Sequence, residues 1–309
     1  MKVGFIGLGI MGASMALRVR SAGHELVVND LRRDAAAPHL AAGCTWADSA
    51  RRVAEASDVI FTSLPGPKEV EAVALAEDGL LNGMRRGTTW FDFTTNSPTV
   101  VRRLHERFAA KGIALLDAPV SGGPTGAKSG KLAIWVSGTR SEFDRHKALL
   151  DAVGDQASYI GPIGAGSIAK LVHNCAGYAI QTALAEVFTL GVKAGVDPLE
   201  LWKAVRQGAL GRKRTFDGLA DHFLSADFDP PAFALRIAHK DVMLATELAR
   251  ELHVPMRIAM LVHEEMSEAL NRDGWGSRDS RVATLLQEER SGVHIAVPME
   301  KLKEVLKNG

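Results

Sequence analysis

The chain has 309 residues and a formal net charge of +1 at pH 7, and 46% of its residues are hydrophobic. This length is sufficient for two domains with separate cores, and the apolar content excludes a disordered protein. The near-zero charge gives no signature of nucleic-acid or membrane binding, and no apolar run reaches the ~20 residues that a membrane span needs. Because the N-terminus leads directly into a strand, we expect a cytoplasmic protein without a signal peptide.

The first predicted element is an apolar strand that begins at Val3 and runs into a glycine-rich turn at residues 7–12, which a helical stretch follows. In a GxGxxG turn the first glycine permits the tight bend, the second lets the backbone approach a pyrophosphate, and the third lets the helix pack close to the strand. The helix N-terminus, with its N–H groups and dipole, favours the phosphate. The turn predicts a dinucleotide site formed by Gly7, Gly9, Ile10, Met11 and Gly12.

A second predicted strand at residues 25–29 ends at Asp30. A carboxylate at this place accepts hydrogen bonds from the adenosine ribose and repels a 2′-phosphate, so it predicts NAD as the cofactor, with NADP as the other candidate. Arg32 and Arg33 follow closely. They either form a solvated helix start or attract the 2′-phosphate and weaken the preference.

Strand and helix continue to alternate through the first half of the chain, which predicts a doubly wound, mostly parallel sheet of Rossmann type. After residue 163 the pattern changes to one long apolar helix near 166–195, and no convincing strand follows it. We therefore predict an α/β dinucleotide-binding domain at 1–163 and an all-helical domain at 164–309, joined by the long helix. The further strands are expected at 58–62, 88–92, 113–116, 131–137 and 157–160, and the further helices near 197–208, 214–224, 233–252, 254–271 and 278–289.

Three loops follow predicted strands at the edge of the sheet where ligands of such folds bind. They contain Leu64-Pro65-Gly66, the run from Thr94 to Pro98, and the run from Asp117 to Gly123. Each is also compatible with an ordinary turn, and Thr95 or Asn96 is a candidate cap for a helix starting at Pro98. The third loop is the most informative, because Ser121-Gly122-Gly123 exposes a hydroxyl and successive N–H groups to a carboxylate.

The start of the long helix carries Lys170 and Asn174, which are four residues apart and therefore share one face. A single lysine usually lies at the surface, but the neighbours of this one are apolar. Oxidation of an alcohol by a nicotinamide requires a group that takes the hydroxyl proton. A lysine performs this task if burial lowers its pKa from about 10.4 toward neutrality, and Asn174 would then hold the substrate.

Four motifs in this order resemble those of the β-hydroxyacid dehydrogenase family: GLGIMG at 7–12, DAPVSGG at 117–123, the segment 164–174, and HKD at 239–241. The resemblance covers nearly the whole chain. It implies that Lys170 is the catalytic acid/base and that Lys240 lies near the cofactor. It also implies substrate contacts from Ser121, Gly122, Gly123 and Asn174, and a nicotinamide side lined by Leu64, Pro65 and Thr95.

Two residues depart from the family pattern. Members commonly have a second asparagine at the position of His173, and glutamine or a small residue at the position of Ser167. The first departure puts the identity of the substrate in doubt, whereas neither changes the role expected for Lys170.

The expected function is NAD(P)-dependent interconversion of a small anionic β-hydroxy acid and its semialdehyde or keto form. An imine reductase-like enzyme and a non-catalytic dinucleotide-binding scaffold are the alternatives, and both would normally lack the lysine. The cluster from Arg212 to Arg214 is either a solvated loop or a reader of a second acidic group on the substrate. The apolar helical half predicts a homodimer or homotetramer. Cys44 and Cys175 lie in no metal-ligand spacing, so we expect buried thiols and no metal.

Overall fold

The computed structural model describes residues 1–208, 217–251 and 256–307. The chain divides into two compact units, Met1–Val172 (unit 1) and His173–Gly309 (unit 2). The first two turns of the long helix thus belong to unit 1. The cluster from Arg212 to Arg214 lies outside the described residues, and the domain boundary at residue 163 stays a prediction.

Unit 1 is built on a nine-stranded sheet with the order β3-β2-β1-β4-β5-β6-β8-β7, in which β9 pairs with β8. The pairs from β3 to β6 are parallel, β8 is antiparallel to β6 and β7, and β9 is parallel to β8. The order 3-2-1-4-5-6 is that of dinucleotide-binding sheets, and it reverses between β1 and β4. The strands are β1 (Lys2–Ile6), β2 (Glu25–Asn29), β3 (Thr45–Trp46), β4 (Val59–Thr62), β5 (Thr89–Asp92), β6 (Ala114–Asp117), β7 (Val120–Ser121), β8 (Ala133–Ser137) and β9 (Gln156–Gly161).

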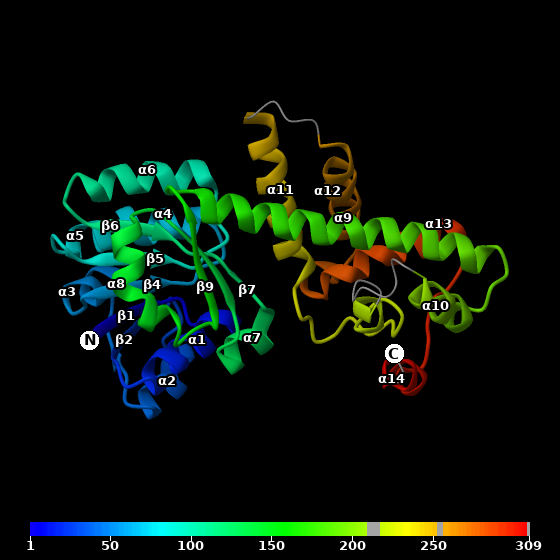
Figure 1. The fold of residues 1–309 in the computed structure, drawn as a ribbon, viewed down its shortest axis with the longest axis horizontal. Helices are drawn as coiled ribbons and strands as arrows, with labels where there is room; N and C mark the ends of the chain where they lie inside the picture. Colours follow the sequence, from blue (N-terminus) through cyan, green and yellow to red (C-terminus); the bar gives the residue numbers. More distant parts are fainter. Residues whose placement is uncertain (209–216, 252–255, 308–309) are drawn as a thin grey trace. The chain divides into compact units, whose positions relative to one another are not determined.

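Helices cover both faces of this sheet, as Figure 1 shows for unit 1. Side chains that alternate along a strand enter different cores: Phe61 belongs to the core that includes residues of the helices α1, α7 and α8, and Ile60 to the core that includes residues of α3, α4 and α6. This alternation explains why the strands are apolar throughout, as expected of a buried parallel sheet. The helices are α1 (Ile10–Ser21), α2 (Ala37–Ala41), α3 (Ala50–Glu55), α4 (Pro67–Leu75), α5 (Leu80–Gly83), α6 (Pro98–Ala109), α7 (Gly123–Ser129) and α8 (Arg140–Leu150), with a 3-10 turn η1 (Arg33–Ala36).

The described part of unit 2 is helical, which confirms the predicted fold class. One core joins the end of the long helix with Trp202 and the chain around Ile295, and a second joins the helices that carry Val242 and Val262. The elements are α9 (Ala165–Lys193), α10 (Pro198–Gln207), η2 (Asp217–Ala220), α11 (Leu235–Glu251), α12 (Arg257–Leu270), η3 (Trp275–Ser277), η4 (Ser280–Thr284), α13 (Leu285–Ser291) and α14 (Met299–Lys307).

Two predicted helices of unit 2 differ from the observed elements. In the described part of 214–224 only the 3-10 turn η2 forms, and the helix predicted at 278–289 begins as a 3-10 turn before it becomes α13. At the start of this 3-10 turn, the Asp279 side chain accepts the N–H of Arg281, so the carboxylate caps the first turn. The helix α14 had no counterpart in the predicted elements.

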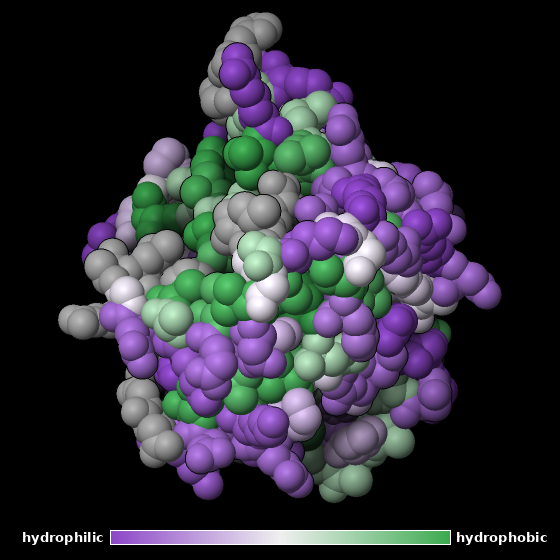
Figure 2. Space-filling view, turned by 90° about the vertical axis from the view of Figure 1, so that its right-hand side faces the viewer, coloured by the Kyte–Doolittle hydropathy of each residue, from purple (hydrophilic) through white to green (hydrophobic). Residues whose placement is uncertain are grey.

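Large apolar side chains lie at the surface of unit 2, and Figure 2 shows apolar areas between polar ones on one face of the molecule. The predicted homodimer or homotetramer would bury such side chains, and it stays a prediction. Within the described ranges, no helix combines the length and apolar character of a membrane span. The exposed large apolar side chains in the described part of unit 2 are those of Ile180, Val196, Ile258, Met260, Leu261, Met299 and Leu306.

Candidate active site

The glycine-rich turn after β1 has the geometry of a dinucleotide cradle. A Cβ on Gly12 would lie 1.9 Å from the carbonyl oxygen of Gly7, and Gly7 itself has a φ of +94°, so both positions require glycine. A Cβ on Gly9, in contrast, would meet no protein atom within 4 Å. The turn is therefore tight where strand and helix pack, and open at the residue predicted to face the pyrophosphate. Ile10 is exposed and Met11 is half-buried at the start of α1.

The carboxylate of Asp30 lies against this turn. Its two oxygens accept the N–H groups of Leu8 at 2.7 Å and Arg32 at 2.9 Å. The side chain at the end of β2 is thus held beside the first turn, as the predicted ribose contact requires. Arg33 lies over the ring of Trp46 and within 3.6 Å of Asp48, so it has partners of its own at the surface.

A buried network orders the next two loops, and its centre is Asp92 at the end of β5. This carboxylate accepts hydrogen bonds from the hydroxyl of Thr62 at 2.8 Å, the N–H of Thr94 at 3.1 Å and the amide of Asn96 at 2.9 Å. Burial raises the pKa of Asp92, although these hydrogen bonds oppose the shift. The network therefore joins β4, β5 and the loop that follows β5.

The same network reaches the predicted nicotinamide side. The hydroxyl of Thr94 accepts the N–H of Leu64 at 3.0 Å, so the loops after β4 and β5 are joined. Leu64 and Thr95 are half-buried, and Pro65 is exposed. Asn96 does not cap the helix α6 through its side chain but lies fully buried against Asp92.

Asp117, at the end of β6, connects the sheet with the start of α9. Its oxygens accept the N–H of Gly164 at 2.9 Å and the N–H of Ser167 at 2.6 Å. The hydroxyl of Ser137 also donates to Asp117 and accepts the N–H of Gly166 at 2.9 Å. Asp117 therefore fixes the helix turn that precedes Lys170, which is half-buried.

The predicted anion receptor follows Asp117 along the chain. Ser121 ends β7 and is half-buried, whereas Gly122 and Gly123 are exposed and have φ values of +135° and +61°. A Cβ on Gly123 would meet no described protein atom within 4 Å, so there is open space beside this residue. The segment enters α7 directly, which gives a short strand and a helix start where the sequence predicted a loop.

In unit 2, Asp241 joins two of the predicted site residues. The amide of Asn174 donates to one carboxylate oxygen at 2.5 Å, and the Nζ of Lys240 lies 2.9 Å from the other. Asp241 is 1% exposed. Because a carboxylate only accepts hydrogen bonds, it fixes which end of the Asn174 amide faces it. His173 is exposed, and Ser167 is fully buried in unit 1.

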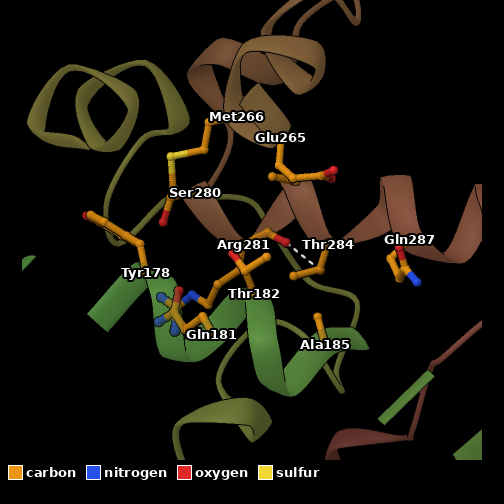
Figure 3. Close-up of a pocket in the computed structure, with 11 residues that line it drawn as sticks. Tyr178, Gln181, Thr182, Ala185, Glu265, Met266, Ser280, Arg281, Thr284 and Gln287 are labelled. Atoms are coloured by element: carbon orange, nitrogen blue, oxygen red, sulfur yellow. Dashed lines mark hydrogen bonds between the residues drawn. The ribbon is translucent and has the colours of Figure 1, made fainter. Parts of the chain in front are cut away.

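Two hollows in unit 2 do not include any predicted site residue. The first is a cavity of about 30 Å³, shown in Figure 3, with Tyr178, Gln181 and Arg281 in its wall. It has room for about one or two water molecules, far below the ~300 Å³ at which small-molecule sites begin. The second, of about 200 Å³, is more apolar and has Ile180, Gln181, Phe223 and Arg281 in its wall.

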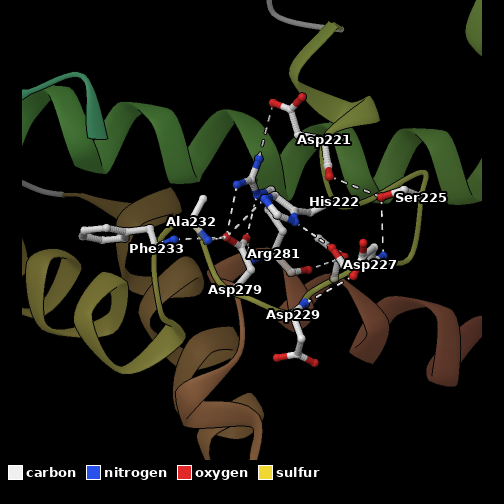
Figure 4. Close-up of polar contacts among 10 residues, drawn as sticks. Asp221, His222, Ser225, Asp227, Asp229, Ala232, Phe233, Asp279 and Arg281 are labelled. Atoms are coloured by element: carbon white, nitrogen blue, oxygen red, sulfur yellow. Dashed lines mark hydrogen bonds and ion pairs between the residues drawn. The ribbon is translucent and has the colours of Figure 1, made fainter. Parts of the chain in front are cut away.

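Arg281 is bound by a buried carboxylate and therefore belongs to the framework of unit 2. Its Nε lies 2.7 Å from one oxygen of Asp279, and a terminal nitrogen lies 3.2 Å from the other (Figure 4). Asp279 also accepts the N–H groups of Ala232 at 3.1 Å and Phe233 at 3.2 Å. The cluster ties the loop before α11 to the start of η4.

The sequence did not reveal what the three buried carboxylates do. Asp92 ends a predicted strand without a recognised motif, and Asp117 and Asp241 lie inside motifs to which no role for them was assigned. For Asp92 and Asp117 the available signal was a charged residue at the end of an apolar run, because such a carboxylate must be hydrogen-bonded if it is buried. That signal does not identify the partners, which are distant in sequence.

Comparisons with known proteins agree with this architecture. A family model for the NAD binding domain of 6-phosphogluconate dehydrogenase matches residues 2–161. A second model, for the NAD-binding region of NADP-dependent 3-hydroxyisobutyrate dehydrogenase, matches residues 164–286. The 2-(hydroxymethyl)glutarate dehydrogenase of Eubacterium barkeri is 32% identical over 295 residues, which are 96% of this chain and 97% of that protein.

Solved structures show the same fold. The crystal structure of 3-hydroxyisobutyrate dehydrogenase from Salmonella typhimurium has a TM-score of 0.80 at 30% identity, and the match covers 93% of this chain and 99% of that one. An imine reductase from Pseudomonas sp. has a TM-score of 0.59 at 17% identity, with 93% of this chain and 99% of that one covered. At that identity the likeness concerns the fold alone.

Proposed function

The chain belongs to the β-hydroxyacid dehydrogenase family, and on this premise we propose that it interconverts a small β-hydroxy acid and its semialdehyde or keto form. It is an oxidoreductase with NAD(P) as cofactor, as the motifs predicted. The chemistry that bound NAD(P) supplies is acceptance of a hydride, or its donation in the reverse direction. The glycine turn fits this cofactor, because it has open space at Gly9, where the motif predicts that the pyrophosphate approaches.

In the proposed site the substrate carboxylate binds the hydroxyl of Ser121 and the backbone N–H groups of Gly122 and Gly123. Lys170 and Asn174 hold the substrate hydroxyl, and Lys170 takes its proton when the alcohol is oxidised. In the reverse direction the protonated amine donates. Positioning and preorganised donors supply most of the acceleration, and proton transfer adds roughly 10²–10⁴-fold.

The observation that carries this proposal is the attachment of α9 to the carboxyl edge of the sheet through Asp117. This contact fixes the turn before Lys170 at the strand end from which the chain continues to Ser121. The anchor of the Lys170 helix and the anion receptor thus start at the end of β6, on the same carboxyl edge of the parallel sheet as the dinucleotide turn after β1. The proposed roles of Leu64, Pro65, Thr95 and Lys240 beside the cofactor rest on the family motifs.

The contacts of Asp30 support a preference for NAD. Two backbone N–H groups hold its carboxylate at the end of β2, and Arg33 is engaged by Trp46 and Asp48. A 2′-phosphate would meet a fixed negative charge there, whereas ribose hydroxyls would find an acceptor. We expect a higher kcat/KM with NAD than with NADP.

The test is a coupled assay of NADH or NADPH formation with 3-hydroxyisobutyrate, 3-hydroxypropionate, L-serine, glycerate, 2-(hydroxymethyl)glutarate and phosphonate analogues. Lys170→Ala and Lys170→Arg should each lower kcat by roughly 10²–10⁴-fold and leave the Kd of NADH unchanged. The arginine variant keeps the charge but does not release its proton near neutral pH. Lys193→Ala, at the other end of the same helix, is the matched control and should retain full activity.

Two outcomes would contradict the proposal. Turnover of the Lys170 variants within a few-fold of the parent would exclude the amine as acid/base. Absence of activity with every hydroxy acid, together with reduction of cyclic imines, would favour the imine reductase alternative, and binding of NADH without any turnover would favour a scaffold.

A further inference from the structure

The buried carboxylate of Asp117 accepts three hydrogen bonds from groups outside its own strand. Its side chain is 1% exposed and accepts the N–H groups of Gly164 and Ser167 as well as the hydroxyl of Ser137. All three donors are neutral and lie far from it in sequence. Each carboxylate oxygen therefore holds one backbone N–H at the start of α9.

The residue that precedes α9 has no side chain that could cap the helix. Gly164 precedes the helix with a φ of +93° and has no side chain, whereas an ordinary cap is Ser, Thr, Asp or Asn. Asp117 performs that function from the neighbouring strand, and its negative charge suits the helix N-terminus. A Cβ on Gly166 would lie 2.4 Å from the carbonyl oxygen of Trp135, so the first turn has no space to shift toward β8.

From this geometry we infer that Asp117 is a positioning residue that sets the location of Lys170 for proton transfer. Lys170 follows Ser167 by three residues, less than one helical turn, so a fixed Ser167 N–H fixes the amine's backbone. The same carboxylate precedes Ser121 by four residues along the chain. One side chain thus ties the acid/base helix to the strand that leads to the anion receptor. This inference rests on the proposed function of Lys170.

The test is Asp117→Asn, which preserves size but replaces one acceptor oxygen by an NH2 group. That group would face the N–H of Gly164 or Ser167, so one of the two hydrogen bonds is lost. Because a misplacement of ~1 Å costs about 10²-fold in rate, we expect kcat to fall about 100-fold with an unchanged Kd for NADH. Asp144→Asn, which changes an exposed carboxylate paired with Arg140, is the matched control and should keep the parent kcat.

A double-mutant cycle with Lys170→Ala separates positioning from general loss of structure. If Asp117 acts through the amine, Asp117→Asn costs little further kcat in the Lys170→Ala background. An equal cost in both backgrounds would overturn the inference, and so would a kcat of Asp117→Asn within threefold of the parent. Ser137→Ala removes one donor to Asp117, and it should lower kcat by up to about tenfold in the parent but little in the Lys170→Ala background. This variant replaces Asp117→Asn in the cycle if the asparagine variant does not fold.

Hydrogen exchange keeps this inference separate from the proposed function. Asp117→Asn should accelerate amide exchange at residues 166–168 and leave exchange in β1 unchanged. If Lys170→Ala remains active, the proposed function fails, although faster exchange would still show the anchor. If amide exchange at residues 166–168 does not change in Asp117→Asn, the positioning role of Asp117 is wrong, whether or not Lys170→Ala is active.

Discussion

Unit 1 and unit 2 each contain buried aspartates, but the groups that stabilise these carboxylates differ between the two units. In unit 1 the donors to Asp92 are neutral groups, and burial raises the pKa of this carboxyl. In unit 2 burial also acts to raise the pKa of Asp279, but the hydrogen bonds and charge of Arg281 outweigh it, and the pKa lies below its ordinary value. Asp92 in the α/β unit thus orders loops through neutral donors alone, whereas Asp279 in the helical unit is held by an ion pair with Arg281.

The difference follows from where the carboxylates lie. Asp92 and Asp117 are paired residues on the neighbouring strands β5 and β6, at the edge where loops present many backbone N–H groups. Asp279 lies between a loop and a helix start, and the nearby Arg281 supplies a cation that reaches it. At Asp92 the carboxyl edge of the parallel sheet thus offers neutral donors alone, whereas at Asp279 an arginine two residues along the chain adds a charged donor to the backbone N–H groups.

The largest expected effect on stability is that of Arg281→Ala. This change removes the arginine that pairs with Asp279, which is 0% exposed, and breaking a buried pair costs about 3–5 kcal/mol of the free energy of unfolding. Urea unfolding measures the loss, and hydrogen exchange should place it around 217–251 and 280–291 rather than in β5. Arg272→Ala, at an exposed pair with Glu289, is the control and should change little. An equal effect of the two variants would refute the contrast between the units.

Alanine substitutions at Gly12 and Gly9 should separate the effect on folding from the effect on NADH binding within unit 1. Gly12→Ala places a Cβ 1.9 Å from a carbonyl oxygen, so it should lower both the Tm and the affinity for NADH. Gly9→Ala meets no protein atom within 4 Å, so it should leave the Tm unchanged and weaken NADH binding roughly tenfold. Differential scanning fluorimetry and fluorescence titration check both. Unchanged NADH affinity in Gly9→Ala would show that the pyrophosphate does not approach this residue.

The two kinds of buried aspartate should respond to pH with opposite signs. The contribution of Asp279 is present above the unfolded pKa of about 3.9 and is lost as pH falls through its lower folded pKa. Asp92 has a raised folded pKa, so the folded state gains stability relative to the unfolded state as pH falls through that value toward about 3.9.

Asp279→Asn and Asp92→Asn measure these two contributions. In urea unfolding followed from neutral pH to about pH 3, Asp279→Asn should lose less stability on acidification than the parent. Asp92→Asn should lack the gain that protonation of Asp92 gives the parent. Parallel pH profiles of the parent and both variants would mean that neither carboxylate has a shifted pKa.

The sequence was sufficient for the elements whose signals are local. The GxGxxG turn, the strand that ends at Asp30 and the long helix α9 each follow from a spacing, a pattern of apolar residues or a turn residue, and each is present where expected. The four motifs also identified the family, which the family models and relatives confirm.

The contacts that organise the candidate site were not predictable in the same way. Asp117 finds its partners about 50 residues further along the chain, and Asn174 meets Asp241 across 67 residues. Those pairings depend on how the sheet and helices pack, which no local pattern encodes. The strand β7 and the helix α14 were also not predicted; β7 has only two residues, which is too short for an alternating pattern to be recognised.

The smallest predicted effect uses the two cysteines, one in each unit. Burial raises the pKa of both thiols, but at Cys44 the positive charge of Arg20 opposes that shift, whereas burial is the cause that acts at Cys175. Since the thiolate is the reactive species, both should react slowly with Ellman's reagent at pH 8, and Cys44 a few-fold faster than Cys175. The variants Cys44→Ser and Cys175→Ser assign the two rates, and Arg20→Gln should reduce the difference. If Cys175 instead reacted faster than Cys44, local opening of α9, rather than ionisation of the thiol, would control the reaction of Cys175 with the reagent.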